Sequence, residues 1–175
     1  MEKERTGTKQ ELKDTLLEEI QDFMRVHYQN IEKNFDNDYT TDNRRKFLAD
    51  LVNDWIEKNN SSNAALARLI GVSRPCVGNW INPPSKGTAG KTITRKNAIA
   101  LGLAMRVSLD DMIRLVLCSD EPGMFPREGF ESEIVDFVEE YLYNNGEYPS
   151  IEMVDEHLIS TLNEGIIKKK NVAEK

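Results

Sequence analysis

Residues 63–82 read Asn63-Ala-Ala-Leu-Ala-Arg-Leu-Ile-Gly-Val-Ser-Arg-Pro-Cys-Val-Gly-Asn-Trp-Ile-Asn82, which is the pattern of two short helices joined by a turn. Gly71 ends the first helix, because glycine tolerates the left-handed backbone of a tight turn. Ser73 is placed to cap the second helix, and Pro75 falls in its first turn, where a missing N–H costs little. The helices would face one another through the apolar residues Leu66, Ala67, Ile70, Val77, Trp80 and Ile81. The segment therefore predicts a helix-turn-helix unit.

The flanking sequence predicts further helices and almost no strand. Apolar residues recur at steps of three and four over residues 9–35, 44–58, 95–105, 109–117, 131–143 and 150–164. The chain of 175 residues is 39% hydrophobic, enough to form a core. We expect an all-α protein in three parts: an N-terminal amphipathic helix and linker (1–41), a helix-turn-helix domain (42–117) and an acidic helical C-terminal extension (118–175).

The charge is unevenly distributed along the chain. The net charge is −7, which by itself argues against a nucleic-acid partner. However, residues 42–107 carry 11 basic and 4 acidic side chains, whereas residues 108–175 carry 6 basic and 16 acidic ones. No acidic residue lies between Glu57 and Asp110. This basic stretch indicates a surface for an anionic partner.

Several classes of protein are disfavoured. No apolar run approaches the roughly 20 residues of a membrane span, and the charged N-terminus does not predict a secretory signal. Cys76 and Cys118 form no disulfide framework, and no Cys/His spacing suggests zinc. No glycine-rich phosphate loop, catalytic serine motif or carboxylate pair stands out. We expect a cytoplasmic protein that is not an enzyme, does not enter a membrane and needs no metal or cofactor.

The motif resembles the Xre/Cro/CI-type (lambda-repressor-like) helix-turn-helix family. Ala67, Gly71-Val72-Ser73-Arg74, Val77 and Trp80-Ile81 fall where that family's pattern places them. The segment 94–104 is similar to the family's fourth helix, and 107–112 to its short fifth helix. The resemblance covers about residues 44–117 and implies a five-helix domain that binds double-stranded DNA.

The resemblance also implies roles for individual residues. It places Ser73, Arg74, Gly78, Asn79 and Asn82 toward the major groove, with base contacts from Arg74 and Asn79, because arginine can bond guanine and asparagine can bond adenine. Phosphate contacts are expected from Asn63, Lys86, Lys91, Thr94, Arg95 and Lys96. The alternative, from the residues alone, is that both sets are solvated polar surface. Gly78 departs from the pattern because it gives the presented helix no side chain there.

The flanking segments leave two questions open. The stripe of Leu12, Leu16, Ile20, Phe23 and Ile31 is either a dimer seam or a face that packs on its own domain. The acidic C-terminal helices are either a surface for a protein partner or simply solvated. We expect a homodimeric, sequence-specific transcriptional regulator, a repressor of bacterial or phage origin. The alternative is a protein-interaction module on a helix-turn-helix scaffold, such as an antitoxin or a phage-encoded inhibitor.

Overall fold

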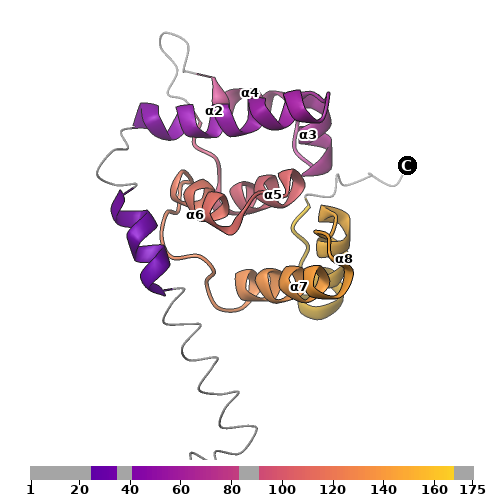
Figure 1. The fold of residues 1–175 in the computed structure, drawn as a ribbon. Coiled ribbons are helices and arrows are strands. Elements are labelled where there is room, and N and C mark those ends of the chain that lie inside the picture. Colours follow the sequence, from indigo (N-terminus) through magenta and orange to yellow (C-terminus); the bar gives the residue numbers. More distant parts are fainter. Residues whose placement is uncertain (1–24, 35–40, 83–90, 168–175) are drawn as a thin grey trace, which may run out of the picture.

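The computed structural model describes residues 25–34, 41–82 and 91–167, and all regular structure in these ranges is helical (Figure 1). The all-α class is confirmed for this part of the chain. After a helical segment at 25–34 come α2 (Thr41–Lys58), α3 (Asn63–Leu69), α4 (Arg74–Ile81), α5 (Arg95–Met105), α6 (Leu109–Leu117), α7 (Phe130–Asn145) and α8 (Ile151–Leu162).

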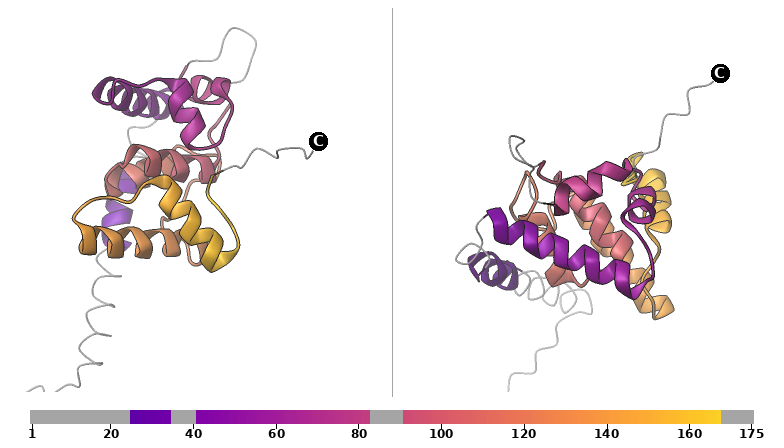
Figure 2. Two further views of the ribbon diagram at one scale, coloured as in Figure 1. Left: turned by 90° about the vertical axis from the view of Figure 1, so that its right-hand side faces the viewer. Right: turned by 90° about the horizontal axis from the view of Figure 1, so that it is seen from above.

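The helices form three layers. Figure 1 shows α2, α3 and α4 above, α5 and α6 in the middle, and α7 and α8 below, and the side view in Figure 2 keeps the same order. Within the layers, α3 and α2 pack on α4, α5 packs on α6, and α7 packs on α8. Between the layers, α5 contacts both α3 and α8. The middle layer therefore joins the helix-turn-helix motif to the C-terminal helices.

The motif folds as its apolar pattern predicts. Gly71 has a φ of 71°, the left-handed backbone that its turn requires. The inward positions Leu66, Ala67, Ile70, Val77, Trp80 and Ile81 are all at most 8% exposed. Ser62 caps α3 by accepting a hydrogen bond from the backbone N–H of Ala65. The expected side-chain cap of α4 is wrong, because Ser73 Oγ lies 3.0 Å from Cys76 Sγ and makes no cap hydrogen bond.

The α5 and α6 helices pack closely because α5 is lined with small residues. A Cβ atom added at Gly102 would lie 2.6 Å from Met112 Cε, so only glycine allows this approach without a shift of Met112. The start of each helix is capped as the sequence indicates. Thr94 accepts from the N–H of Asn97 at α5, and Ser108 accepts from the N–H of Asp111 at α6.

A buried ion pair attaches α7 to α5. Arg95 Nε lies 2.6 Å from Glu131 Oε1 and Nη2 lies 2.8 Å from Oε2, and both side chains are less than 10% exposed. Arg95 Nη1 also donates to the carbonyl of Glu121, and Glu131 Oε2 accepts from the backbone N–H of Arg127. These bonds compensate for moving both charges out of water.

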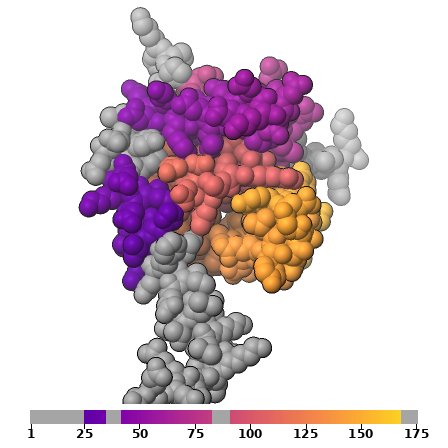
Figure 3. Space-filling view, in the orientation of Figure 1, coloured from indigo at the N-terminus to yellow at the C-terminus, as the bar shows by residue number. Residues whose placement is uncertain are grey.

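The N-terminal stripe is described only in part. Leu12, Leu16, Ile20 and Phe23 lie outside the described residues. Ile31 is 8% exposed and belongs to the core of its own chain, as does the neighbouring Tyr28. His27 Nε2 lies 2.7 Å from Asp110 Oδ1 in the first turn of α6, and Figure 3 shows segment 25–34 against the middle layer. At Ile31 the stripe thus packs on its own domain, so a dimer seam at this residue does not fit the structure.

Glu131→Gln is expected to lower the free energy of unfolding by about 3–5 kcal/mol, because it leaves the buried Arg95 charge uncompensated. Urea unfolding measures the change, with Glu140→Gln on the exposed side of α7 as the control. A double variant, Arg95→Met with Glu131→Leu, should recover most of the loss. Equal unfolding midpoints for Glu131→Gln and Glu140→Gln would show that the pair contributes nothing.

Cys118 is expected to resist alkylation in the folded protein. Burial raises the pKa of its thiol from 9.0 to about 12, and the positive charge of Arg44 offsets only part of this shift. The thiolate is therefore scarce below that pH. With iodoacetamide at about pH 8, mass mapping should find Cys76, which is partly exposed, modified first. Both cysteines should react in urea, and equal rates in the folded state would contradict the burial of Cys118.

Candidate nucleic-acid interface

The predicted groove-facing residues share one face of α4. Ser73, Arg74, Asn79 and Asn82 are exposed and Gly78 is partly exposed, while Val77, Trp80 and Ile81 bury the opposite face. Arg74, Gly78 and Asn82 follow one another at steps of four residues and Asn79 is next to Gly78, so these four positions share one side of α4, and Ser73 directly precedes its first residue. The structure therefore brings together all five residues that were predicted to face the major groove.

A hollow of about 590 Å³ lies beside this face, between α4 and the start of α3. Asn63 lines it together with Arg74 and Gly78. The side-chain Oδ1 of Asn63 is buried and has no hydrogen-bond partner among the described residues. Asn63, which the sequence predicts to contact phosphate, thus lies beside Arg74 and Gly78 of the exposed α4 face.

A second hollow, of about 340 Å³, lies between α2 and the segment that leads into α5, and it touches α4 only at Trp80 of the buried face. Its lining includes the cationic residues Arg44 and Arg45 of α2 and Lys91, together with Trp80 of α4 and the acidic residue Asp120. Lys91 was expected to contact phosphate, but Arg44 and Arg45 were not singled out. The signal available for them was their place in the net-positive segment 42–107.

The start of α5 differs from the expectation for a phosphate contact. Thr94 is exposed and caps the helix. Arg95 is 6% exposed, and its guanidinium is bonded to Glu131 and to backbone carbonyls, so the predicted phosphate contact from Arg95 does not fit the structure. Lys96 is accessible, but its Nζ lies 2.8 Å from Glu164 Oε1 and 5.0 Å from the centre of the Phe130 ring. Lys86 lies outside the described residues.

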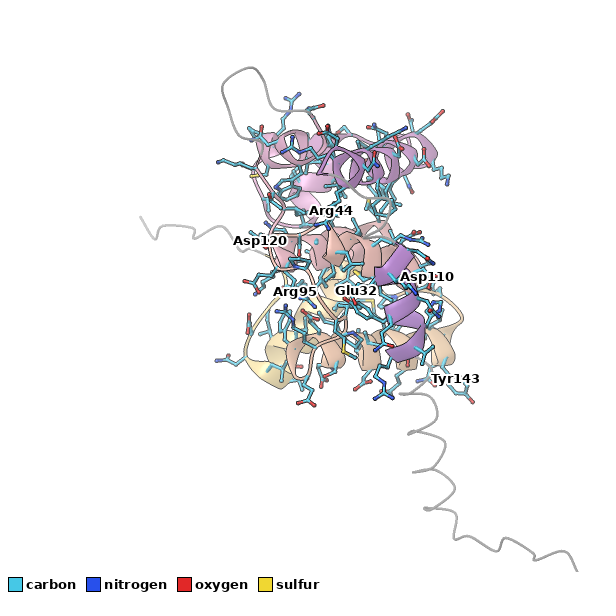
Figure 4. All side chains as sticks on the ribbon, turned by 90° about the vertical axis from the view of Figure 1, so that its left-hand side faces the viewer. Glu32, Arg44, Arg95, Asp110, Asp120 and Tyr143 are labelled. Atoms are coloured by element: carbon cyan, nitrogen blue, oxygen red, sulfur yellow. The ribbon has the colours of Figure 1, made fainter. Side chains whose placement is uncertain are left out.

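A carboxylate occupies the backbone position that a phosphate would use at this helix end. Asp120 Oδ1 accepts a 2.9 Å hydrogen bond from the backbone N–H of Arg95. Figure 4 shows Asp120 beside Arg95 between the upper layer and the lower one. The helix N-terminus favours negative charge whether it belongs to a phosphate or to a carboxylate. At the start of α5, the backbone position that favours an anion is therefore already filled by a carboxylate of the chain itself.

The described residues contain no group of three or more His, Cys, Asp or Glu side chains placed to hold a metal ion. In the same ranges, no helix has both the length and the apolar character needed to cross a bilayer.

Gly78→Ala is expected to raise the free energy of unfolding by about 0.5–1 kcal/mol, because glycine is a poor helix former. An added Cβ would meet only Asn82 Nδ2, at 3.6 Å, so the structure has room for it. The contrast is Gly71→Ala, which places a Cβ atom on a backbone with a φ of 71° and should destabilise the protein. Urea unfolding of both variants is the measurement. If Gly78→Ala destabilises the protein as Gly71→Ala does, the structure has no room for a side chain at position 78.

Three comparisons with known proteins were made. The sequence matches no protein-family model and no curated protein, and no solved structure matches the chain. The resemblance of residues 44–117 to one helix-turn-helix family therefore stays a prediction from the motif, and the case for a function depends on the geometry of the α4 surface.

Proposed function

We propose that this chain is a sequence-specific, double-stranded DNA-binding transcriptional regulator of the Xre/Cro/CI type. The observation that carries the proposal is the exposed face of α4, which presents hydrogen-bonding side chains inside a stretch with no acidic residue from Lys58 to Leu109. A helix with one buried and one polar face, braced by a second helix at its start, has the geometry used to enter a major groove.

The dimensions of α4 suit this role. An α-helix with its side chains is about 10–12 Å across, which fits the major groove of B-DNA, about 12 Å wide. Arg74 at the start of α4 and Asn79 five residues later would contact base edges. Asn63 lines the hollow beside this face, and Arg45 and Lys91 line the second hollow, so these three residues would contact phosphates.

The proposal extends to a homodimer that acts as a cytoplasmic repressor. One unit of this size contacts few base pairs, and two-fold dimers of such domains read half-sites about 34 Å apart. The N-terminal segment before residue 25 is one candidate for the dimer contact, because its apolar stripe continues toward Leu12.

A second candidate function is a protein-interaction module on the same scaffold. Two observations favour it. Gly78 leaves the middle of the presented face without a side chain, and the cations at the start of α5 are already paired with carboxylates of the chain itself. In that case the partner would be a protein, as for an antitoxin or an inhibitor, and DNA would not be the main target.

The first experiment is fluorescence anisotropy of the full chain on random duplex DNA across a salt series, followed by selection of the bound sequences. Salt-sensitive binding that enriches a palindrome supports a dimeric regulator, and the half-site spacing reports its geometry. Weak binding without enrichment would contradict the proposal and favour the protein-interaction module.

Arg74→Gln is expected to weaken binding to the selected sequence by about 1–3 kcal/mol and to relax the preference at one base pair, because a bidentate contact is lost. The control is Arg106→Gln, which removes the same charge from the opposite end of α5, about 16 Å along the helix from Arg95. The control should change affinity less and leave the preference intact. Anisotropy titrations against the selected site and its single-base variants provide both numbers.

Asn79→Ala gives an independent check of the same face, at a different base pair. If both Arg74→Gln and Asn79→Ala bind every sequence as the unaltered chain does, α4 is not the helix that reads the DNA.

A further inference from the structure

Three carboxylates from the acidic C-terminal region meet at the first turn of α5. Asp120 accepts from the backbone N–H of Arg95, and Glu131 pairs with the Arg95 guanidinium. Glu164 Oε1 lies 2.8 Å from Lys96 Nζ. These residues come from three separate places in the chain: the turn that follows α6, the start of α7 and the segment after α8. The region with a net charge of −10 thus folds onto the one with a net charge of +7.

The three contacts differ in how easily a competing anion could replace them. The Arg95–Glu131 pair is buried, and both partners make further hydrogen bonds, so opening it would strand two charges. The Lys96–Glu164 pair is accessible, with 39% and 59% of the two side chains exposed. An exposed pair contributes little to stability, at most about 1 kcal/mol. Lys96 is therefore the cation of this group that a phosphate could capture.

The backbone holds Glu164 in place beside Lys96. Asn163 ends α8 in the left-handed conformation, and Ile166 is buried at 1% exposure. The carboxylate of Asp155, itself 5% exposed, accepts a 2.8 Å hydrogen bond from the backbone N–H of Ile167. The residues on both sides of Glu164 are thus held against α8. The Glu164 carboxylate can therefore contact α5 without the entropy cost of ordering a flexible segment.

We propose that Glu164 competes with a DNA phosphate for Lys96, so that the C-terminal region lowers the affinity of the chain for DNA. This inference rests on the proposed function and adds a form of regulation to it. When DNA binds, a phosphate replaces the Glu164 carboxylate at Lys96 Nζ, and the contact at the start of α5 forms only after this exchange. Any protein partner or modification that draws Glu164 away would raise DNA affinity.

The test compares Glu164→Gln with Glu156→Gln in the full chain. Glu156 is an exposed acid of α8 for which the described residues show no ion pair, so its variant removes the same charge without freeing Lys96. At about 50 mM salt, Glu164→Gln is expected to bind the selected duplex about two- to five-fold more tightly than the unaltered chain. Glu156→Gln should give a clearly smaller gain. Unfolding midpoints check that each variant is folded.

A second measurement separates the local exchange from a general change in charge. In a Lys96→Gln background, Glu164→Gln should give no larger gain than Glu156→Gln does. The bound complex makes the Lys96–phosphate contact with or without Glu164, so Glu164→Gln should leave the dependence of log affinity on log salt unchanged, whereas Lys96→Gln should flatten it by about 0.9, the value for one lost phosphate contact. Glu156→Gln should leave this slope unchanged.

The outcomes distinguish failure of the inference from failure of the proposed function. If the unaltered chain binds DNA through Arg74 but Glu164→Gln and Glu156→Gln have equal effects, the exchange at Lys96 is wrong and the function stands. If no variant binds DNA at any salt concentration while all are folded, both are wrong. If Glu164→Gln binds DNA and the unaltered chain does not, the result supports both the proposed function and the competition at Lys96.

Discussion

The pairing of Arg95 with Glu131 is the interaction on which the arrangement of the layers depends. A buried guanidinium is tolerated only when its donors find acceptors. Here the acceptors are one carboxylate and the carbonyls of the turn that follows α6. That turn consequently wraps around Arg95 and sets where α7 begins. The acidic helices are therefore held against α5 by a specific contact, beyond the general attraction between a negative region and a positive one.

Most of the fold could be predicted because its signals are local. Caps, turn glycines and apolar spacing lie within a few residues of the helix ends that they determine, and the bounds of α5 and α6 agree with the sequence prediction. The partner of Arg95 could not be predicted, because Glu131 lies 36 residues away and nothing in the surrounding sequence marks either residue as buried. Arg95 reads as a surface cation among other surface cations until α7 is placed against it.

The candidate site also has a part that the sequence predicts and a part that it does not. The face of α4 follows from the spacing of Val77, Trp80 and Ile81, since a short amphipathic helix has only one other side to expose. The hollow lined by Arg44, Arg45 and Lys91 depends on how α2 packs beside the segment before α5. No local sequence pattern predicts that these two segments lie next to each other. The count of charged residues along the chain indicated a positive region. It could not indicate which of these cations would pair with carboxylates in the folded protein.

Gly78 has a consequence for how such a surface can change over generations. The glycine sits in the middle of the presented face, where a Cβ atom would meet only Asn82 Nδ2 at an ordinary contact distance of 3.6 Å, whereas at Gly102 the end of the Met112 side chain would have to shift. A single codon change at position 78 can therefore add a hydrogen-bonding or apolar group to the face without repacking the core. If α4 reads DNA, a new target sequence is one substitution away, and the rest of the protein need not adapt to it.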